Sequence, residues 1–277
     1  MRYIQFMRVP PVVLSIAGYD PSSGAGVTAD LKTAAAHGCY AVTCITALTV
    51  QTSQGVFEVQ PLDPDLVRRT LGALAEDLDI AAVRVGMLGS ATVASTVASI
   101  LKRLGLRNIV VDPVLRSSSG AALLEERGSE VLREELLPLA DVITPNVDEA
   151  AVLAGSGAPP GDRPWQDLLP WLRTTAAELR RLDSRAVVIT GGHLQQANDY
   201  LSYVENGRVR EEIFPGVHLE SRSTHGTGCA FATSIACQLA LGRELPEAVR
   251  TAKEYVRKAV ESAYPLGKGI GPINHKV

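Results

Sequence analysis

The stretch around which the chain is organised reads Ser223-Thr-His-Gly-Thr-Gly-Cys229 and runs on into the apolar segment 230–240. Two glycines, Gly226 and Gly228, allow the backbone to approach a ligand closely and to reach angles that other residues avoid. A helix that begins here points its free N–H groups and its positive dipole end into the turn, which favours an anion such as phosphate. Cys229 would lie in the first helical turn, where the same field is expected to lower a thiol pKa. The alternative is a glycine-rich connection into a core helix, because Gly-Thr-Gly alone is a weak signal.

The composition indicates a globular protein with a large apolar core. The chain has 277 residues, of which 46% are hydrophobic and 21% charged, so disorder is not expected. The net charge is −3, so the composition shows no excess of basic residues that would indicate binding to nucleic acid. The apolar runs are short and interrupted, so we expect neither a membrane span nor a signal peptide. The four cysteines show no metal-binding spacing, which favours free thiols in a reducing compartment and a cytoplasmic protein.

Apolar strand-like runs alternate with helical patterns along the chain. Most runs are rich in β-branched residues, and the helical segments are rich in helix formers or carry apolar residues at helical spacing. The Asn206-Gly207 pair between two alternating runs predicts a β-hairpin from residues 200–204 and 209–214. We expect further strands at 12–17, 41–51, 82–85, 108–111, 141–144 and 186–190, and further helices at 27–37, 65–78, 92–104, 130–137, 148–153, 165–182 and 245–263. The glycine-rich tail 266–272 is expected to be a flexible loop.

This alternation predicts an α/β fold with a mostly parallel central sheet. Nearly all-apolar strands are typical of a sheet that helices cover on both faces. In such sheets ligands bind beyond the carboxyl ends of the strands. Polar or glycine-rich segments stand at these ends, namely Gly18 to Gly26, Gly86-Met87, Asp112-Pro113, Pro145-Asn146, Gly191-Gly192-His193 and the Gly-Thr-Gly loop.

Side chains at these strand ends suit phosphoryl transfer. That reaction needs charge stabilisation on the moving group, a metal site and an aligned acceptor hydroxyl. The backbone of the Gly-Thr-Gly loop can supply the first. Oxygen ligands for Mg²⁺, direct or through water, are available from Asp112, Asn146 and Glu149. Alternatively, Asp112 forms an Asx turn, and Asn146 and Glu149 form a helix-capping pair. The chain has neither a G-x-G-x-x-G fingerprint in register nor a Walker A lysine, so a nucleotide would need another phosphate-binding design.

Longer motifs follow one another in a fixed order. They read A-G-Y-D-P-S-S-G-A-G-V-T-A-D-L-K, I-T-A-L-T-V-Q-T, V-G-M-L, D-P-V, T-P-N-V-D-E-A, G-G-H-L, S-T-H-G-T-G-C and G-K-G-I-G-P. Together they resemble the ribokinase-like superfamily and, within it, the hydroxymethylpyrimidine/phosphomethylpyrimidine kinases of thiamin biosynthesis. The resemblance covers residues 12–273 and rests on a highly specific combination. It implies a three-layer α/β/α fold, a single kinase domain over residues 1–277 and a homodimer.

The resemblance also implies the reaction and its phosphate side. ATP and Mg²⁺ would be used to phosphorylate the hydroxymethyl group of 4-amino-5-hydroxymethyl-2-methylpyrimidine, and then the monophosphate so formed. Cys229 would act with the backbone of Gly226, Thr227 and Gly228, either as the base or only as a positioning group. Further residues implied by motif match are the nucleotide and phosphate contacts Asn146, His193, Thr224 and His225 and the metal ligands Asp112 and Glu149. The alternative for the two histidines is a turn-capping role.

On the pyrimidine side, the resemblance implies that Gln51 holds the aminopyrimidine edge. An amide suits a ring nitrogen beside an amine, because it donates and accepts at once. The other residues implied here are Asp30, Gly18 and Ala25 as lining and Met87 and Val114 as ring contacts. Alternatively, Gln51 is a solvated amide at a strand end, and Met87 and Val114 belong to the ordinary core.

The chain departs from the family pattern at three places. Thr190 stands where Lys usually precedes Gly-Gly-His, Ser23 replaces the first glycine of Ser-Gly-Gly-Ala-Gly, and residues 118–121 read Ser-Ser-Gly-Ala in place of Lys-Ser-Gly-Asp. The loss of two lysines removes positive charge near the expected phosphates. We expect this loss to affect nucleotide affinity and the second phosphorylation more than the first. Arg116 is a candidate substitute, although arginine and lysine differ in reach and geometry. Two alternatives stay open: a pyridoxal kinase of the same branch, and a non-catalytic regulator that binds the pyrimidine.

Overall fold

The protein is described here by a computed structural model, which covers residues 9–117, 120–159, 161, 164–192, 194 and 196–277. Its strands are β1 (Val12–Tyr19), β2 (Tyr40–Thr52), β3 (Gly55–Pro61), β4 (Ile80–Val85), β5 (Ile109–Val111), β6 (Val142–Ile143), β7 (Ala186–Thr190), β8 (Asp199–Glu205) and β9 (Arg208–Phe214). Its α-helices are α1 (Gly26–Ala36), α2 (Pro64–Asp77), α3 (Ala91–Leu104), α4 (Glu126–Val131), α5 (Val147–Ala154), α6 (Trp165–Arg180), α7 (Thr227–Ala240) and α8 (Leu245–Glu261).

The described strands form one sheet in the order β3-β2-β1-β4-β5-β6-β7-β8-β9. Strands β1, β2, β4, β5, β6 and β7 run parallel, and only β3 and β8 pair antiparallel with the parallel set, with β9 antiparallel to β8. The register places Leu14 of β1 beside Val42 on one side and Val83 on the other. The mostly parallel sheet predicted from the sequence is therefore confirmed.

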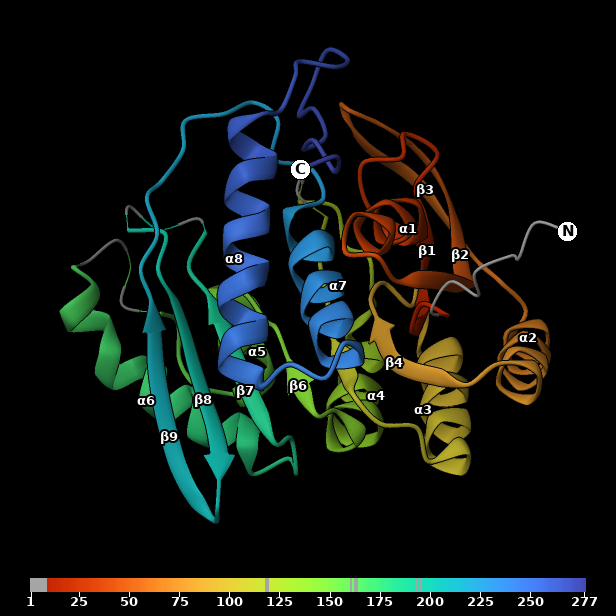
Figure 1. Ribbon diagram of the computed structural model, residues 1–277, viewed down its shortest axis with the longest axis horizontal. Coiled ribbons are helices and arrows are strands. Elements are labelled where there is room, and N and C mark those ends of the chain that lie inside the picture. The colour runs from red at the N-terminus through yellow and green to blue at the C-terminus, as the bar shows by residue number, and fades with distance from the viewer. Residues whose placement is uncertain (1–8, 118–119, 160, 162–163, 193, 195) are drawn as a thin grey trace, which may run out of the picture.

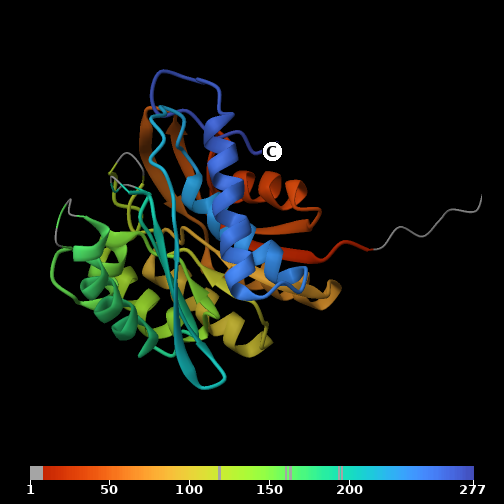
Figure 2. The same ribbon diagram turned by 60° about the vertical axis from the view of Figure 1, so that its left-hand side comes forward.

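Helices cover both faces of the sheet, as Figures 1 and 2 show. Alternation along the strands supplies a core on each side, because successive side chains of a strand point to opposite faces. Val13 and Val110 pack with α1, α7 and α8, whereas Leu14 and Val111 pack with α2, α3, α5 and α6. A fully buried aliphatic side chain of this kind contributes about 1.5–3 kcal/mol relative to exposure. The result is the predicted three-layer α/β/α arrangement.

Local signals explain where several elements begin and end. Asp63 caps α2 by accepting from the N–H of Asp65, with Pro64 at the first helical position. Ser90 caps α3, which ends at Gly105 with a left-handed φ of 60°. The Asn206-Gly207 hairpin also forms as predicted, with positive φ at both residues. No helix in the described part of the chain is long and apolar enough to cross a membrane.

Three expectations from the sequence need correction. Strand β3 was not expected, although it pairs with β2 from Ala47 to Thr52. The helix predicted at 130–137 is in fact the end of α4 followed by a π-helical turn and a short 3₁₀ turn. The tail 266–272 is irregular but held in place: Ile270 N–H donates to the Ser53 carbonyl over 2.8 Å, and His225 N–H donates to the Gly271 carbonyl over 3.0 Å.

Candidate active site

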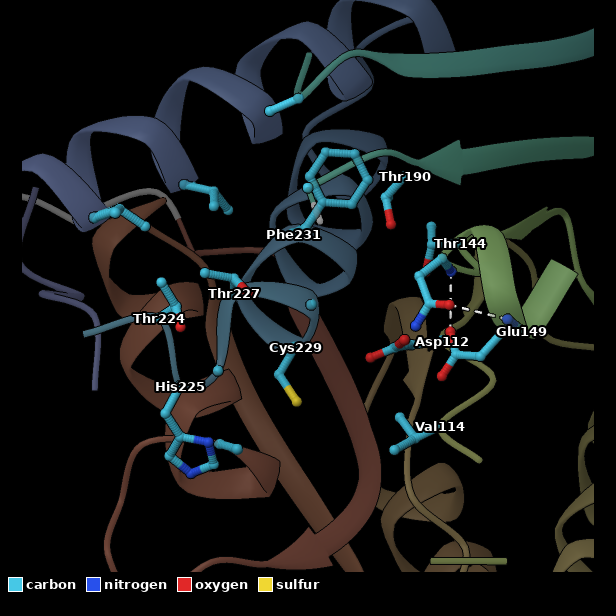
Figure 3. Close-up of a pocket in the computed structure, with 18 of the residues that line it drawn as sticks. Asp112, Val114, Thr144, Glu149, Thr190, Thr224, His225, Thr227, Cys229 and Phe231 are labelled. Carbon is cyan, nitrogen blue, oxygen red and sulfur yellow. Dashed lines mark hydrogen bonds between the residues drawn. The ribbon is translucent and has the colours of Figure 1, made fainter. Parts of the chain in front are cut away.

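A cavity of about 1520 Å³ opens at the carboxyl ends of the parallel strands and is shown in Figure 3. Segments from both halves of the chain line it, including the glycine-rich loop after β1 and the N-terminus of α7. The described site residues that the sequence predicts all line the cavity except Asp30; they are Gly18, Ala25, Gln51, Met87, Asp112, Val114, Asn146, Glu149, Thr224, His225, Gly226, Thr227, Gly228 and Cys229. His193 lies outside the described residues.

Glycine is required for different structural reasons at the two glycine positions around the start of α7. Gly226 has a φ of 91°, and a Cβ there would collide with the carbonyl oxygen of Gly24, so this position packs two loops together. Gly228 is exposed to the cavity, where a Cβ would meet only Oδ2 of Asp112 at 3.9 Å. The first turn of α7 is therefore open to the cavity at Gly228, with the Asp112 carboxylate beyond it, although the N–H of Thr227 already donates to the Thr224 carbonyl. An anion held there would benefit from the helix dipole.

Asp112 and Glu149 stand on the wall opposite Cys229 in Figure 3. Asn146 and Glu149 form the capping box of α5: Asn146 Oδ1 accepts from Glu149 N–H over 2.9 Å, and Glu149 Oε2 accepts from Asn146 N–H over 3.0 Å. The helix-capping alternative thus applies, while both side chains also line the cavity. Burial, with the charge of Asp112 nearby, raises the pKa of Glu149 to about 8.

This pair of carboxylates fits a divalent cation. Burial raises the pKa of Asp112 as well, with the Asp30 charge adding to it. The ionised forms of two neighbouring carboxyl groups repel each other in a partly buried cavity, and a cation between or beside them stabilises those ionised forms. No group of three or more His, Cys, Asp or Glu side chains in the described residues could hold a metal without other ligands. Mg²⁺ commonly completes its shell with water and substrate phosphates.

Arg84 of β4 lies beneath the cavity and is completely buried. Its Nη2 donates to Asp112 Oδ2 over 2.7 Å and its Nη1 to Asp30 Oδ2 over 3.0 Å. Ser15 and Thr233 hydroxyls donate to the same Asp30 carboxylate over 2.6 and 2.8 Å. Asp30 is 0% exposed and does not reach the cavity, so its predicted role as substrate lining is wrong. It turns inward because α1 packs this side chain against the sheet.

Cys229 does not have the activated thiol that its place in the first turn of α7 suggests. Burial, together with the charges of Asp112 and Asp30, raises the pKa of Cys229 to about 11 despite the opposing field of Arg84. The expectation of a lowered pKa is therefore wrong, because two carboxylates and desolvation outweigh the helix dipole. At neutral pH the side chain is a protonated thiol.

At the other end of the cavity, Gln51 and His225 are neighbours. The side-chain nitrogen of Gln51 lies 3.1 Å from Nε2 of His225. The same ring nitrogen lies 2.8 Å from Oδ2 of Asp20, which also accepts from the N–H groups of Gly24 and Ala25. Asp20 therefore organises the glycine-rich loop, and His225 joins that loop to the proposed substrate contact.

Sequence reasoning missed Asp20, Arg84 and Lys253. Arg84 carried a readable signal, since it is a lone charge inside an otherwise apolar strand. Asp20 stood inside a loop already marked as functional, but nothing in the pattern showed where its carboxylate points. Lys253 of α8 reaches the cavity with Nζ 2.6 Å from Asp199 Oδ2 and 2.7 Å from the Ala197 carbonyl. A lysine on an amphipathic helix gives no such signal.

Solved structures with this architecture include kinases. The ADP complex of Bacillus subtilis pyridoxal kinase matches with a TM-score of 0.83 and 32% identity, over 96% of this chain and 97% of that one. Phosphomethylpyrimidine kinase from Clostridium difficile matches with a TM-score of 0.75 and 34% identity, over 90% of this chain and 99% of that one. The fold is therefore ribokinase-like, and the protein is a kinase.

The sequence comparisons narrow this class. A family model described as phosphomethylpyrimidine kinase matches residues 20–274, so the chain belongs to the phosphomethylpyrimidine kinase family. The hydroxymethylpyrimidine/phosphomethylpyrimidine kinase of Streptomyces coelicolor is 42% identical over 266 residues, which are 96% of this chain and 94% of that protein. The family resemblance read from the motifs is confirmed.

Proposed function

We propose that this protein transfers the γ-phosphoryl group of ATP to the hydroxymethyl group of 4-amino-5-hydroxymethyl-2-methylpyrimidine, and then phosphorylates the monophosphate to the diphosphate in thiamin biosynthesis. The observation that carries the proposal is a single cavity with an amide, Gln51, at one end and the N-terminus of α7 facing two carboxylates at the other. An aromatic alcohol and a phosphate chain fit these two ends.

The α7 N-terminus would hold the transferred phosphoryl group. The backbone at Gly228 lines the cavity, where a Cβ would meet only Asp112, whereas the N–H of Thr227 donates to the Thr224 carbonyl over 3.3 Å. Mg²⁺ would be held by Asp112 and Glu149, directly or through water, and when bound it supplies positive charge to the phosphate oxygens. Asn146, Thr144 and Thr224 line the cavity and are proposed nucleotide contacts, and Thr144 Oγ1 is buried without a partner among the described residues. His193 stays a prediction for this role.

Cys229 is proposed to position the acceptor hydroxyl, with a protonated thiol. Phosphoryl transfer proceeds through a loose transition state in most analyses, which asks little activation of the nucleophile. The raised pKa of Cys229 makes a thiolate base rare at neutral pH. The thiol lies in the first turn of α7, from where it would orient a hydroxymethyl group toward a phosphoryl group held at the helix N-terminus.

The substrate ring is proposed to lie between Met87 and Val114, near Gly18 and Ala25. Met87 is held in place, since its carbonyl accepts from the Thr46 hydroxyl over 2.6 Å and its sulfur packs on Gly18. Packing leaves only 2.9 Å between the Met87 sulfur and a Cβ built on Gly18, so a larger residue there would narrow the ring site.

Cationic groups other than the family lysines are proposed to meet the phosphates. Thr190 lines the cavity without charge. Arg116 and Lys253 also line it, and Lys253 is already paired with Asp199. The second phosphorylation would draw on these two side chains.

A second candidate is pyridoxal phosphorylation, which the similarity to Bacillus subtilis pyridoxal kinase favours. The name of the Streptomyces coelicolor relative and the family match favour the pyrimidine as the main substrate. A non-catalytic regulator is the weakest reading, because a pure binder needs neither the carboxylate pair nor the helix N-terminus. We further propose that residues 1–277 act as one kinase domain in a cytoplasmic homodimer, without nucleic-acid or membrane partners.

Product analysis by mass spectrometry tests the proposal. Purified protein is incubated with Mg-ATP and, separately, the hydroxymethylpyrimidine, its monophosphate and pyridoxal. Mono- and diphosphate from the pyrimidine are the expected products. Monophosphate alone would restrict the protein to the first step, pyridoxal phosphate as the main product would favour the second candidate, and no transfer to any of the three would contradict the kinase assignment for these substrates.

A further inference from the structure

Nε2 of His225 has two polar neighbours with opposite requirements. It lies 2.8 Å from Oδ2 of Asp20 and 3.1 Å from the amide nitrogen of Gln51. A ring nitrogen carries either a proton or a lone pair, so it cannot donate to the carboxylate and accept from the amide at once. The chemistry of the surrounding groups decides which arrangement is present.

Asp20 requires the proton to be on Nε2. Its carboxylate also accepts from Ser22 Oγ over 2.7 Å and from Ala25 N–H over 2.8 Å. Backbone N–H groups of Ser22 and Gly24 also donate to its two oxygens, so both oxygens act as acceptors and the group is ionised. Nε2 of His225 therefore donates to Asp20.

The Gln51 amide must then turn its oxygen toward His225. Amide oxygen and nitrogen are assigned from the hydrogen-bond network, because they look alike at ordinary resolution. With Oε1 facing His225, the amide nitrogen faces Oγ1 of Thr49 across 3.2 Å. The Thr49 hydroxyl accepts from it and donates to the Tyr19 carbonyl over 3.0 Å. Each donor in this chain from Asp20 to Tyr19 then meets an acceptor.

The histidine ring is fixed strongly enough to impose this orientation. The backbone of His225 is held on both sides: its carbonyl accepts from the Ile273 N–H over 3.3 Å, and its backbone N–H donates to the Gly271 carbonyl. A Cβ on Gly24 would collide with the ring, so that loop packs directly against it. In Figure 3 the ring lies at the end of the cavity away from Thr190 and Thr144, with Cys229 between.

We propose that His225 is a specificity-determining residue that locks the Gln51 amide, so that its N–H faces a ring nitrogen of the substrate and its oxygen faces the neighbouring exocyclic amine. The inference rests on the proposed function, because an aminopyrimidine has this acceptor and donor side by side. The opposite amide orientation would place an amide N–H against the Nε2–H of His225, which already donates to Asp20, and would leave that amide N–H without an acceptor. The pyridine nitrogen of pyridoxal has carbon on both sides and no adjacent amine, so the lock acts less on that ring.

A double-mutant cycle separates this role from a phosphate-binding role. His225→Phe keeps the ring that packs on Gly24 but removes the donor, and Gln51→Leu removes the amide whose orientation is at issue. We expect His225→Phe to weaken binding of the hydroxymethylpyrimidine by tenfold or more in calorimetry without nucleotide, and to change ATP affinity by less than twofold. In the Gln51→Leu background the same change should alter pyrimidine binding by less than twofold. Gln54→Leu, at an exposed position of the same hairpin, is the matched control and should bind as wild type.

Two results would overturn the proposal. One is an equal loss of pyrimidine binding on His225→Phe in both backgrounds at unchanged melting temperature; the other is a loss of ATP binding alone. A ligand-free measurement covers the case in which the pyrimidine is not the substrate: ¹⁵N NMR of histidine-labelled wild type should show a proton on Nε2 of His225. An Nε2 without a proton would contradict the proposal, because it could not fix the orientation of the Gln51 amide. A protonated Nε2 in a protein that does not bind the pyrimidine would contradict the proposed function but would still support the inferred amide orientation.

Discussion

Arg84 donates from Nη2 to Oδ2 of Asp112 over 2.7 Å, and this ion pair joins the floor of the cavity to the core beneath it. The same guanidinium donates to Asp30 over 3.0 Å, so one buried cation serves two buried carboxylates. Gly86 has no room for a side chain because a Cβ there would strike the guanidinium. The cluster therefore connects α1, the sheet and the metal side of the site.

Removing the Arg84 cation should destabilise the fold. Arg84→Met leaves two buried carboxylates without a cationic partner, and breaking such an ion pair costs about 3–5 kcal/mol. Arg84→Lys should cost less but still impair activity, since one ammonium cannot match the two-pronged geometry. Urea unfolding at pH 7 measures the difference. Adding Asp30→Asn to Arg84→Met should recover part of the loss, and a loss below about 1 kcal/mol for Arg84→Met would contradict this description of the cluster.

Glu149→Gln should raise stability while lowering activity. The folded pKa of Glu149, about 8, lies above its ordinary value of 4.5. The protonated form is thus favoured in the folded state, and the stability linked to this group is present below pH 4.5 and lost as pH rises through 8. Glutamine keeps the capping box but carries no charge. We expect the free energy of unfolding at pH 8 to increase by on the order of 2 kcal/mol, and turnover to fall tenfold or more.

Denaturation at pH 5 and pH 8, with a steady-state assay, checks this prediction. The gain should be small at pH 5, where wild-type Glu149 is already protonated in the folded protein. Glu149→Ala serves as the control, because it removes the charge and the cap together and should gain less. A variant with full activity at low Mg²⁺ would argue against Glu149 as a metal ligand.

The two glycines of the Gly-Thr-Gly loop should respond differently to alanine. Gly226→Ala places a Cβ against the Gly24 carbonyl at a left-handed φ, which should cost more than about 1 kcal/mol of stability. Gly228→Ala has room in the fold, and its methyl group enters the space before Asp112. We expect Gly228→Ala to melt within a few degrees of wild type yet to lose most of its affinity for ATP. Unchanged ATP binding in Gly228→Ala would mean that the phosphates lie elsewhere.

The pH dependence of turnover separates the two roles of Cys229. A base with a pKa near 11 would make the rate rise about tenfold per pH unit from pH 7 to 9. The positioning role predicts a nearly flat profile over this range. It also predicts that Cys229→Ser keeps turnover within about tenfold of wild type, since a hydroxyl can orient the acceptor in the same way. A steep profile that Cys229→Ser abolishes would establish the base.

Patterns that are local in the sequence predicted the fold well. The apolar strands Val12–Tyr19 and Ala186–Thr190 and the Asn206-Gly207 hairpin follow from residue type and spacing. Strand β3 was not predicted because it is a short, half-exposed strand at the edge of the sheet, without a clear alternating pattern of apolar and polar residues. The tail near Ile270 looked flexible because its contacts are with Ser53 and Arg222, far away in the sequence.

For the site, too, the sequence predicted what depends on local pattern and missed what depends on contacts between distant residues. Strand ends marked Asp112 and Gly228 correctly as cavity residues, since topology gathers the carboxyl ends of parallel strands. Asp30 was misplaced because a helix has several faces, and only packing decides which one meets the sheet. The predicted direction of the Cys229 pKa shift was wrong because burial raises this pKa, and the carboxylates that add to the rise lie in α1 (Asp30) and just after β5 (Asp112), not in its own helix.

The most direct test of the pyrimidine kinase assignment is a competition experiment. Equimolar 4-amino-5-hydroxymethyl-2-methylpyrimidine and pyridoxal are mixed with the protein and limiting Mg-ATP, and the initial product ratio gives the ratio of kcat/KM. We predict that the pyrimidine is preferred by at least tenfold, because Gln51 can pair with both its ring nitrogen and its amine. A preference for pyridoxal, or transfer to neither, would contradict the assignment.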